Sequence, residues 1–211
     1  MKISIKYHIP AVKLEFVNIN LSKDNKIFLD PLKIRRGTSD FDIKCYQKID
    51  VFIKLLLKLV RNRDYQSLIE IIDNLYERNE TRLGYSLETT YGKSMGANGG
   101  RDLIKLLAKE EMVKNGEVED IFDCIMMVQN IGEDKVSDLI TTIIFLDLID
   151  YTQKQCKLWK IQIQNVEIEK LCWDGETRNW IKAQAMLPID NRKTNCICSQ
   201  KICRRKVYFF I

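Results

Sequence analysis

The spacing of apolar residues changes twice along the chain, and each change predicts a change of secondary structure. Over residues 1–34 apolar and polar positions alternate, which is typical of strands with one buried face. Over residues 41–156 apolar residues recur three or four positions apart, which predicts amphipathic helices. Over residues 159–211 the alternation returns. The pattern therefore predicts an α+β protein with strands at both ends of the chain.

Individual elements follow from the same spacing and from residues that start or stop them. The run Ile27-Phe28-Leu29 predicts a short strand that ends at Asp30-Pro31, because proline cannot donate a ladder hydrogen bond. The expected helices cover residues 41–60, 64–76, 101–114, 118–128 and 133–156. We expect this cluster of about five helices to pack against a mainly antiparallel sheet, formed by the N- and C-terminal strands of a single domain spanning residues 1–211.

Composition indicates a folded protein and argues against export. Apolar residues make up 45% of the chain and charged residues 30%, a balance that supports a hydrophobic core. Charged residues interrupt the two most apolar stretches, 51–60 and 136–149, and no apolar run of signal-peptide length opens the chain. Seven cysteines, an odd number, are typical of reduced thiols. We therefore expect a soluble, cytoplasmic protein with no membrane partner.

Positive charge is concentrated at one end of the sequence. The formal net charge is +5, yet residues 191–211 carry six basic and no acidic side chains, which leaves the remainder at −1. A smaller basic cluster contains Lys33, Arg35 and Arg36. A partner that bears phosphate groups, such as nucleic acid, fits this distribution. The expected nucleic-acid-binding residues in the tail are Arg204, Arg205 and Lys206.

A glycine-rich segment precedes one of the expected helices. Five of the nine glycines lie in residues 80–100, where backbone amides and the following helix start can approach a phosphate. The candidate phosphate-binding residues are Gly92, Lys93, Ser94, Gly99, Gly100 and Arg101. The segment is not a nucleotide-binding P-loop, because Leu87 stands where that motif needs its first glycine. A surface loop without a ligand is the alternative.

Acidic residues supply candidate metal ligands. Asp134 and Asp138 lie one turn apart on an apolar expected helix, while Asp30 follows a strand and Glu88 lies in the glycine-rich segment. Carboxylates are the ligands that Mg²⁺ prefers, so we expect these four residues to hold Mg²⁺. The expected catalytic residues are Asp30, Glu88 and Asp138. The structural alternatives are a turn start at Asp30, a helix start at Asp134, and a solvent-facing or arginine-paired carboxylate at Asp138.

Cysteine and histidine carry weaker signals. Cys196, Cys198 and Cys203, with Cys172 as a fourth ligand, fit a zinc site in number but not in the usual paired spacing. We favour the interpretation that they are reduced thiols in strands. His8 is the only histidine, which argues against hydrolysis through a serine–histidine or cysteine–histidine pair.

Three segments together resemble an uncharacterised family of bacterial proteins. They are Ile27-Phe28-Leu29-Asp30-Pro31, the segment from Leu83-Gly84-Tyr85-Ser86 through the glycines, and residues 131–138 with 151–156. The resemblance covers residues 27–156 and implies no activity and no site residue. Small proteins rich in lysine, isoleucine and asparagine are often encoded among antiphage genes, so the resemblance implies an association with bacterial defence.

Two kinds of function follow from these observations. The first is a metal-dependent phosphodiesterase, a nuclease acting in bacterial defence, because carboxylate-bound Mg²⁺ activates water without histidine. The alternative is a non-catalytic component of a larger complex or homo-oligomer that binds nucleic acid or protein through its basic tail. A purely structural partner protein is a third hypothesis, which exposed apolar surface on the tail strands would favour.

Overall fold

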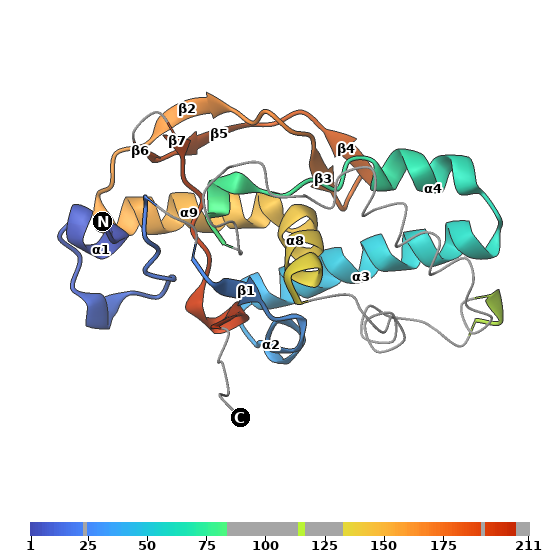
Figure 1. Ribbon diagram of the computed structural model, residues 1–211, viewed down its shortest axis with the longest axis horizontal. Coiled ribbons are helices and arrows are strands. Elements are labelled where there is room, and N and C mark those ends of the chain that lie inside the picture. Colours follow the sequence, from blue (N-terminus) through green and yellow to red (C-terminus); the bar gives the residue numbers. More distant parts are fainter. Residues whose placement is uncertain (23–24, 84–113, 117–132, 191–192, 206–211) are drawn as a thin grey trace.

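The structure is a computed structural model of the 211-residue chain and describes residues 1–22, 25–83, 114–116, 133–190 and 193–205. It confirms the α+β class (Figure 1). Within these ranges the helices are α1 (Ile3–Lys6), α2 (Pro31–Arg36), α3 (Asp40–Arg61), α4 (Tyr65–Ile72), α8 (Glu133–Ile143) and α9 (Phe145–Trp159), with 3-10 turns η1 (Ala11–Lys13), η2 (Asn79–Thr81) and η3 (Gln200–Ile202). The strands are β1 (Ile27–Leu29), β2 (Gln164–Glu167), β3 (Cys172–Asp174), β4 (Asn179–Ile181), β5 (Gln184–Leu187), β6 (Ile189–Asp190), β7 (Lys193–Thr194) and β8 (Cys203–Arg205).

The two helices predicted first are confirmed as α3 and α4, although α4 ends at Ile72 rather than at residue 76. A capping box opens α3: the Ser39 hydroxyl accepts from the Asp42 amide, and the Asp42 carboxylate accepts from the Ser39 amide at 3.2 Å. The Asp64 carboxylate accepts from the Ser67 amide and opens α4. The expected helices at 101–114 and 118–128 fall almost entirely outside the described residues.

The long helix predicted over residues 133–156 is two helices, α8 and α9, which meet at Ile144. The Thr141 and Thr142 hydroxyls donate to the carbonyls of Ser137 and Asp138, four residues earlier, at 2.7 and 2.9 Å. Such back-bonding by threonine competes with the backbone ladder and bends helices. Apolar periodicity does not register this bend, because both helices keep the same buried spacing.

The strands form four two-stranded antiparallel pairs among the described residues: β1–β8, β2–β5, β3–β4 and β6–β7. The pairing of β1 with β8 joins the two ends of the chain, as predicted, with Leu29 opposite Cys203 and Ile27 opposite Arg205. The hairpin β3–β4 turns at Gly175, where the Asp174 carboxylate accepts from the amides of Glu176 and Thr177.

The prediction of strands throughout residues 1–34 is wrong except at β1. The N-terminal segment contains α1 and η1 instead, followed by an extended stretch that meets residues 197–200 only through isolated contacts. Val12, expected on the buried face with Leu14 and Phe16, is 94% exposed, whereas Val17 is buried. The alternating pattern does not produce a strand here, because the 3-10 turn η1 interrupts the chain before Leu14. After this turn the consecutive residues Phe16 and Val17 are both buried, which an alternating strand does not allow.

Aromatic side chains join the helices to the C-terminal hairpin. The Phe52 ring of α3 lies 4.8 Å from the Trp173 ring of β3 and 6.2 Å from the Trp180 ring of β4, each edge to face. The Trp180 indole nitrogen donates to the Ile71 carbonyl of α4 at 3.0 Å. None of the helices in the described ranges is both long and apolar enough to span a bilayer.

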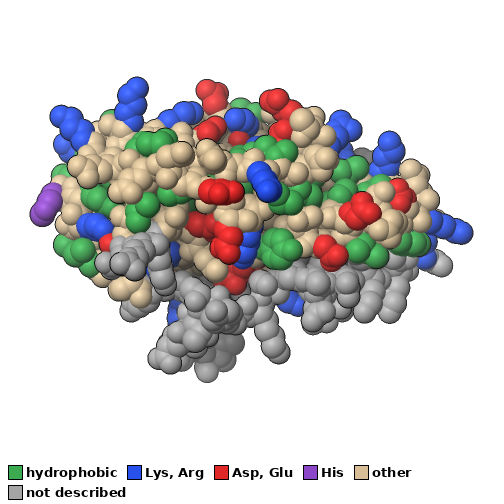
Figure 2. Space-filling view, turned by 90° about the horizontal axis from the view of Figure 1, so that it is seen from above, with side chains coloured by type: hydrophobic (Ala, Val, Ile, Leu, Met, Phe, Trp, Pro, Cys, Tyr) green, Lys and Arg blue, Asp and Glu red, His purple; other side chains and the backbone are tan. Residues whose placement is uncertain are grey.

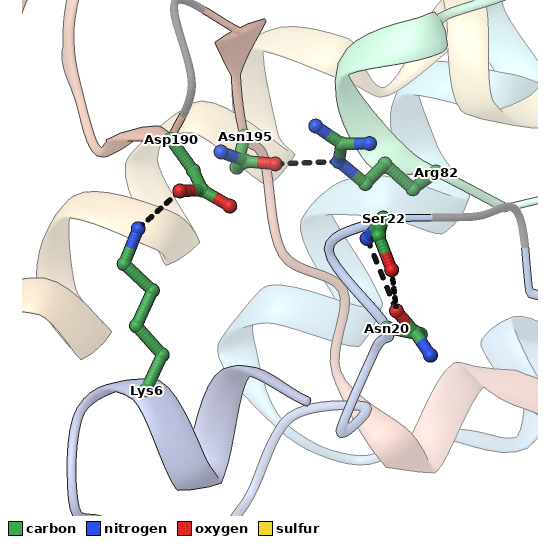
Figure 3. Close-up of polar contacts among 6 residues, drawn as sticks. All are labelled: Lys6, Asn20, Ser22, Arg82, Asp190 and Asn195. Carbon is green, nitrogen blue, oxygen red and sulfur yellow. Dashed lines mark hydrogen bonds and ion pairs between the residues drawn. The ribbon is translucent and has the colours of Figure 1, made fainter. Parts of the chain in front are cut away.

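A buried arginine fixes the approach to β3. Arg78 is 2% exposed, its guanidinium donates to the carbonyls of Lys170 and Leu171, and its carbon lies 4.4 Å from the centre of the Phe145 ring. Figure 3 shows two further links between distant segments: Lys6 with Asp190, and the Arg82 guanidinium with the Asn195 side chain at 2.6 Å. It also shows Asn20 accepting from Ser22 within the N-terminal segment.

Gly37, between α2 and α3, is required for close packing. A Cβ at this position would lie 2.4 Å from the Asp42 side chain that caps α3. We predict that Gly37→Ala lowers the free energy of unfolding by about 1–3 kcal/mol. Gly175→Ala, where the nearest atom is Lys48 Cγ at 3.2 Å, is the control and is expected to cost about 1 kcal/mol or less. Urea unfolding measures both, and equal costs would contradict the assignment.

Candidate nucleic-acid interface

The candidate interface begins where β1 ends. All three residues of β1 are buried, and Asp30 follows them as the first residue outside the strand. The Asp30 Oδ1 atom accepts from the amides of Leu32 and Lys33 at 3.0 and 3.4 Å, and Pro31 occupies the first helical turn. Asp30 therefore starts α2 as its N-cap, the turn-starting role that the sequence left open.

The short helix α2 presents a basic face to solvent. Lys33, Arg35 and Arg36 are exposed in its last turn, where positive charge complements the helix dipole. The Lys33 ammonium donates to the Cys203 carbonyl at 2.7 Å. This hydrogen bond attaches the basic helix to the strand that carries the tail arginines.

The C-terminal segment places further basic residues beside α2. Lys201 lies exposed in η3, which packs against α2, and Arg204 and Arg205 follow in β8 opposite Phe28 and Ile27. Figure 1 shows α2, β1 and this C-terminal segment together at the lower edge of the molecule. Basic clusters about 170 positions apart in the sequence therefore converge, and we call these six positions the basic surface: Lys33, Arg35, Arg36, Lys201, Arg204 and Arg205. The side chains of Lys33, Arg35, Arg36 and Lys201 are exposed, whereas those of Arg204 and Arg205 are not described.

The opposite face differs in charge. Figure 2 shows the molecule from the side of β2 and β5, where acidic and basic side chains of the described residues alternate. Exposed residues of this region include Glu167, Glu176 and Lys182. Mixed charge gives little net attraction for a polyanion, whereas charges of one sign reinforce one another. The described residues therefore favour the α2 side as the binding face.

Two of the predicted catalytic carboxylates lie on packed elements. Helix α8 packs against β1, and the Ser137 hydroxyl accepts from the Leu29 amide at 2.9 Å. Asp30 directly follows Leu29, and Asp138 directly follows Ser137. Asp138 is half-buried, and its carbonyl accepts from Thr142, whose hydroxyl also donates to the Tyr76 carbonyl at 2.5 Å.

The other predicted site residues lie outside what the structure describes. Asp134 falls in the first turn of α8, and its side chain is not described. The residues outside the described ranges are Glu88, Gly92, Lys93, Ser94, Gly99, Gly100, Arg101 and Lys206. The described chain reaches the glycine-rich segment at Leu83, which pairs with Asn25 just before β1. Among described side chains, no group of three or more His, Cys, Asp or Glu is arranged to hold a metal ion.

Asp147 is a buried carboxylate with a structural role. It is 2% exposed on α9 and pairs with two lysines of α3: the Lys48 ammonium at 2.6 Å and the Lys44 ammonium at 3.5 Å. The negative charge of Asp147 raises the pKa of Lys44 above its ordinary value. The pair holds α9 against α3, and no expected site residue takes part in it.

The cysteines of the described chain are buried and free. Six cysteines are free, and burial raises the pKa of Cys156 to about 11 and that of Cys196 to about 12. Burial likewise raises the pKa of Cys45 and Cys172. The sequence favoured reduced strand thiols over zinc ligands: Cys172 and Cys203 lie in β3 and β8, whereas Cys196 and Cys198 lie between β7 and η3 and not in a strand. His8 is exposed in the turn after α1 rather than in a strand.

Sequence reasoning found the basic clusters but missed that they share one surface. Lys201 was counted only as tail charge, and Lys33, Arg35 and Arg36 only as a lesser cluster. The signal that joins them is the strand pair β1–β8, because each strand lies directly beside one cluster in the sequence. Asp147 lies in a helical pattern and Arg78 lies just after the helix predicted over residues 64–76, and neither position gives a sign of its burial.

Comparison with known proteins identifies a family. A family model described as a domain of unknown function (DUF8370) matches residues 8–206, so the chain belongs to this family. No curated protein matches the chain, and no solved structure matches it. The match includes β1, α2 and β8, which carry the basic surface. Its description names no activity, so function is argued from the geometry.

Removing one partner of the buried ion pair tests its structural role. We predict that Lys48→Met lowers the free energy of unfolding by about 3 kcal/mol, because it leaves the Asp147 carboxylate buried beside only the exposed Lys44. Lys44→Met, the same change at a side chain that is 61% exposed, is expected to cost at most about 1 kcal/mol. Denaturant unfolding measures the free energy of unfolding of both variants. A larger decrease for Lys44→Met than for Lys48→Met would show that Lys44, and not Lys48, is the main partner of Asp147.

Proposed function

We propose that the protein binds nucleic acid through its basic surface. The observation that supports this proposal is the convergence of α2 with η3 and β8, which gathers two basic clusters on one side of the molecule. Neutralising several phosphates releases condensed counterions, which is the main source of affinity for nucleic acid without sequence preference. Phosphate contacts of this kind position a protein on a strand and carry no base recognition.

The arrangement of the basic surface suits a backbone rather than a single phosphate. Lys33, Arg35 and Arg36 come from one helical turn, whereas Lys201 comes from η3 across the contact between the two elements. Positive charges spread over two elements match the repeated charges of a strand. The anchoring of Lys33 on the Cys203 carbonyl fixes the relative position of the two elements before a ligand arrives.

Charge reversal tests the interface. We predict that Arg36→Glu combined with Lys201→Glu weakens binding of RNA or DNA about tenfold or more and lowers the salt dependence by roughly two released ions. The matched control is Lys58→Glu combined with Lys154→Glu, two exposed lysines of α3 and α9. Both double variants change the net charge from +5 to +1, so only position differs. Equal losses in a salt titration would show that binding follows total charge and not this surface.

A second candidate function is metal-dependent phosphodiester cleavage in the bound nucleic acid, the nuclease activity expected from the sequence. The packing of α8 on β1 favours it, because the Leu29–Ser137 hydrogen bond brings the segments of Asp30 and Asp138 together beside α2. Carboxylates of this kind would hold Mg²⁺, which neutralises charge on the phosphate and activates water. An association of this activity with bacterial defence stays a prediction.

An asparagine substitution separates helix capping from metal binding at Asp30. Asparagine caps helices as well as aspartate does but lacks the charge, so Asp30→Asn is expected to keep the fold. We predict that it lowers Mg²⁺- or Mn²⁺-dependent cleavage of plasmid DNA or RNA about a hundredfold, as does Asp138→Ala. Asp64→Asn, the same change at the N-cap of α4, is expected to keep full activity. If the wild-type protein binds but does not cleave, the second candidate is wrong and the first remains.

A further inference from the structure

The segment that carries the tail arginines also contains two thiols in contact. The sulfur atoms of Cys198 and Cys203 lie 2.8 Å apart, and both residues are buried, 1% and 6% exposed. Ser199 and the three residues of the turn η3 fill the four positions between them. Each thiol is the hydrogen-bonding neighbour of the other, and their separation exceeds the length of a disulfide bond by only about 0.8 Å.

The backbone holds both cysteines in place from outside the turn. The Cys198 carbonyl accepts from the Val17 amide at 2.8 Å, and the Cys203 carbonyl accepts from the Lys33 ammonium at 2.7 Å. Leu29 of β1 is the strand partner of Cys203. Because each end of the turn is anchored separately, the two sulfur atoms face each other without help from a ligand.

We propose that Cys198 and Cys203 are a redox pair that closes to a disulfide across η3 when the protein meets a peroxide. The closed bond would join Cys198, which is attached to the N-terminal segment, to β8, which is attached to β1. Oxidation would thus fix the start of the strand that holds Arg204 and Arg205. The proposal does not depend on nucleic-acid binding.

The chemistry assigns different roles to the two thiols. Cys203 is the more exposed, so its sulfur attacks the peroxide and the O–O bond breaks. The proton of the Cys203 thiol leaves with the departing oxygen, so a sulfenic acid and one water form. The Cys198 sulfur then attacks the sulfenic sulfur, the S–O bond breaks, and the oxygen leaves as a second water with the proton from Cys198. Two thiols and one hydrogen peroxide therefore give one disulfide and two waters. Burial and the neighbouring thiol raise the pKa of Cys198, so Cys198 keeps its proton until the second step, in which that proton leaves with the oxygen.

Thiol counting and peptide mapping test the proposal on the full chain. The reduced protein is treated with hydrogen peroxide, denatured and alkylated, and we expect five alkylated cysteines instead of seven, with seven restored by dithiothreitol. Trypsin cleaves after Lys193, Lys201 and Arg204, so the disulfide would join peptide 194–201 to peptide 202–204.

Cys196 provides the matched control, because it is buried and lies in the same tryptic peptide as Cys198. In Cys196→Ser we expect the two peptides to remain joined, and in Cys198→Ser or Cys203→Ser we expect them to be separate. If a variant fails to fold, the tryptic peptide map of the oxidised wild-type protein still shows whether peptides 194–201 and 202–204 are joined. Seven alkylated cysteines after peroxide treatment, or peptides that stay joined in Cys198→Ser, would overturn the proposal.

Discussion

The antiparallel pairing of β1 with β8 is the constraint on which the rest of the arrangement depends. Leu29 and Cys203 are partners although 174 positions separate them, and closing such a loop costs on the order of 5 kcal/mol of chain entropy. Burial of Ile27, Phe28 and Leu29, each contributing about 1.5–3 kcal/mol, offsets that cost. The Ser137 hydroxyl satisfies the Leu29 amide from a third element, α8. A three-residue strand thus connects both chain ends and the helical layer.

Buried and exposed charges have separate tasks in this fold. Arg78 and Asp147 are each 2% exposed and join neighbouring elements, the first through backbone carbonyls and the second through Lys48. Both charged groups are shielded from water, and an unpaired buried charge strongly destabilises a protein. The fold therefore depends on the groups that pair with Arg78 and Asp147. The described side chains of the basic surface, Lys33, Arg35, Arg36 and Lys201, are instead exposed, and Lys33 also donates to the Cys203 carbonyl. This separation explains why charge reversal at Arg36 and Lys201 tests binding with little effect on folding.

The sequence predicts elements whose signals are local and misses features set by long-range packing. Apolar spacing identifies α3, Asp64 identifies the start of α4, and the apolar run before Asp30-Pro31 identifies β1. The bend at Ile144 escapes prediction, because threonine hydroxyls cause it within an unbroken apolar pattern. In the candidate site, residue types were predictable, but the convergence of the two basic clusters depends on which strands pair.

The segment from Cys198 to Arg205 combines three properties, which restricts how it can vary. Its backbone pairs with β1, its thiols contact each other across η3, and η3 carries the exposed Lys201 beside α2. The surface exists only once residues that are distant in the sequence have met through the pairing of β1 with β8, whereas a helix such as α3 needs only local contacts. A partly unfolded chain therefore carries the same charges without the same surface. Any affinity that depends on the position of these charges, rather than on their total, would require the folded protein.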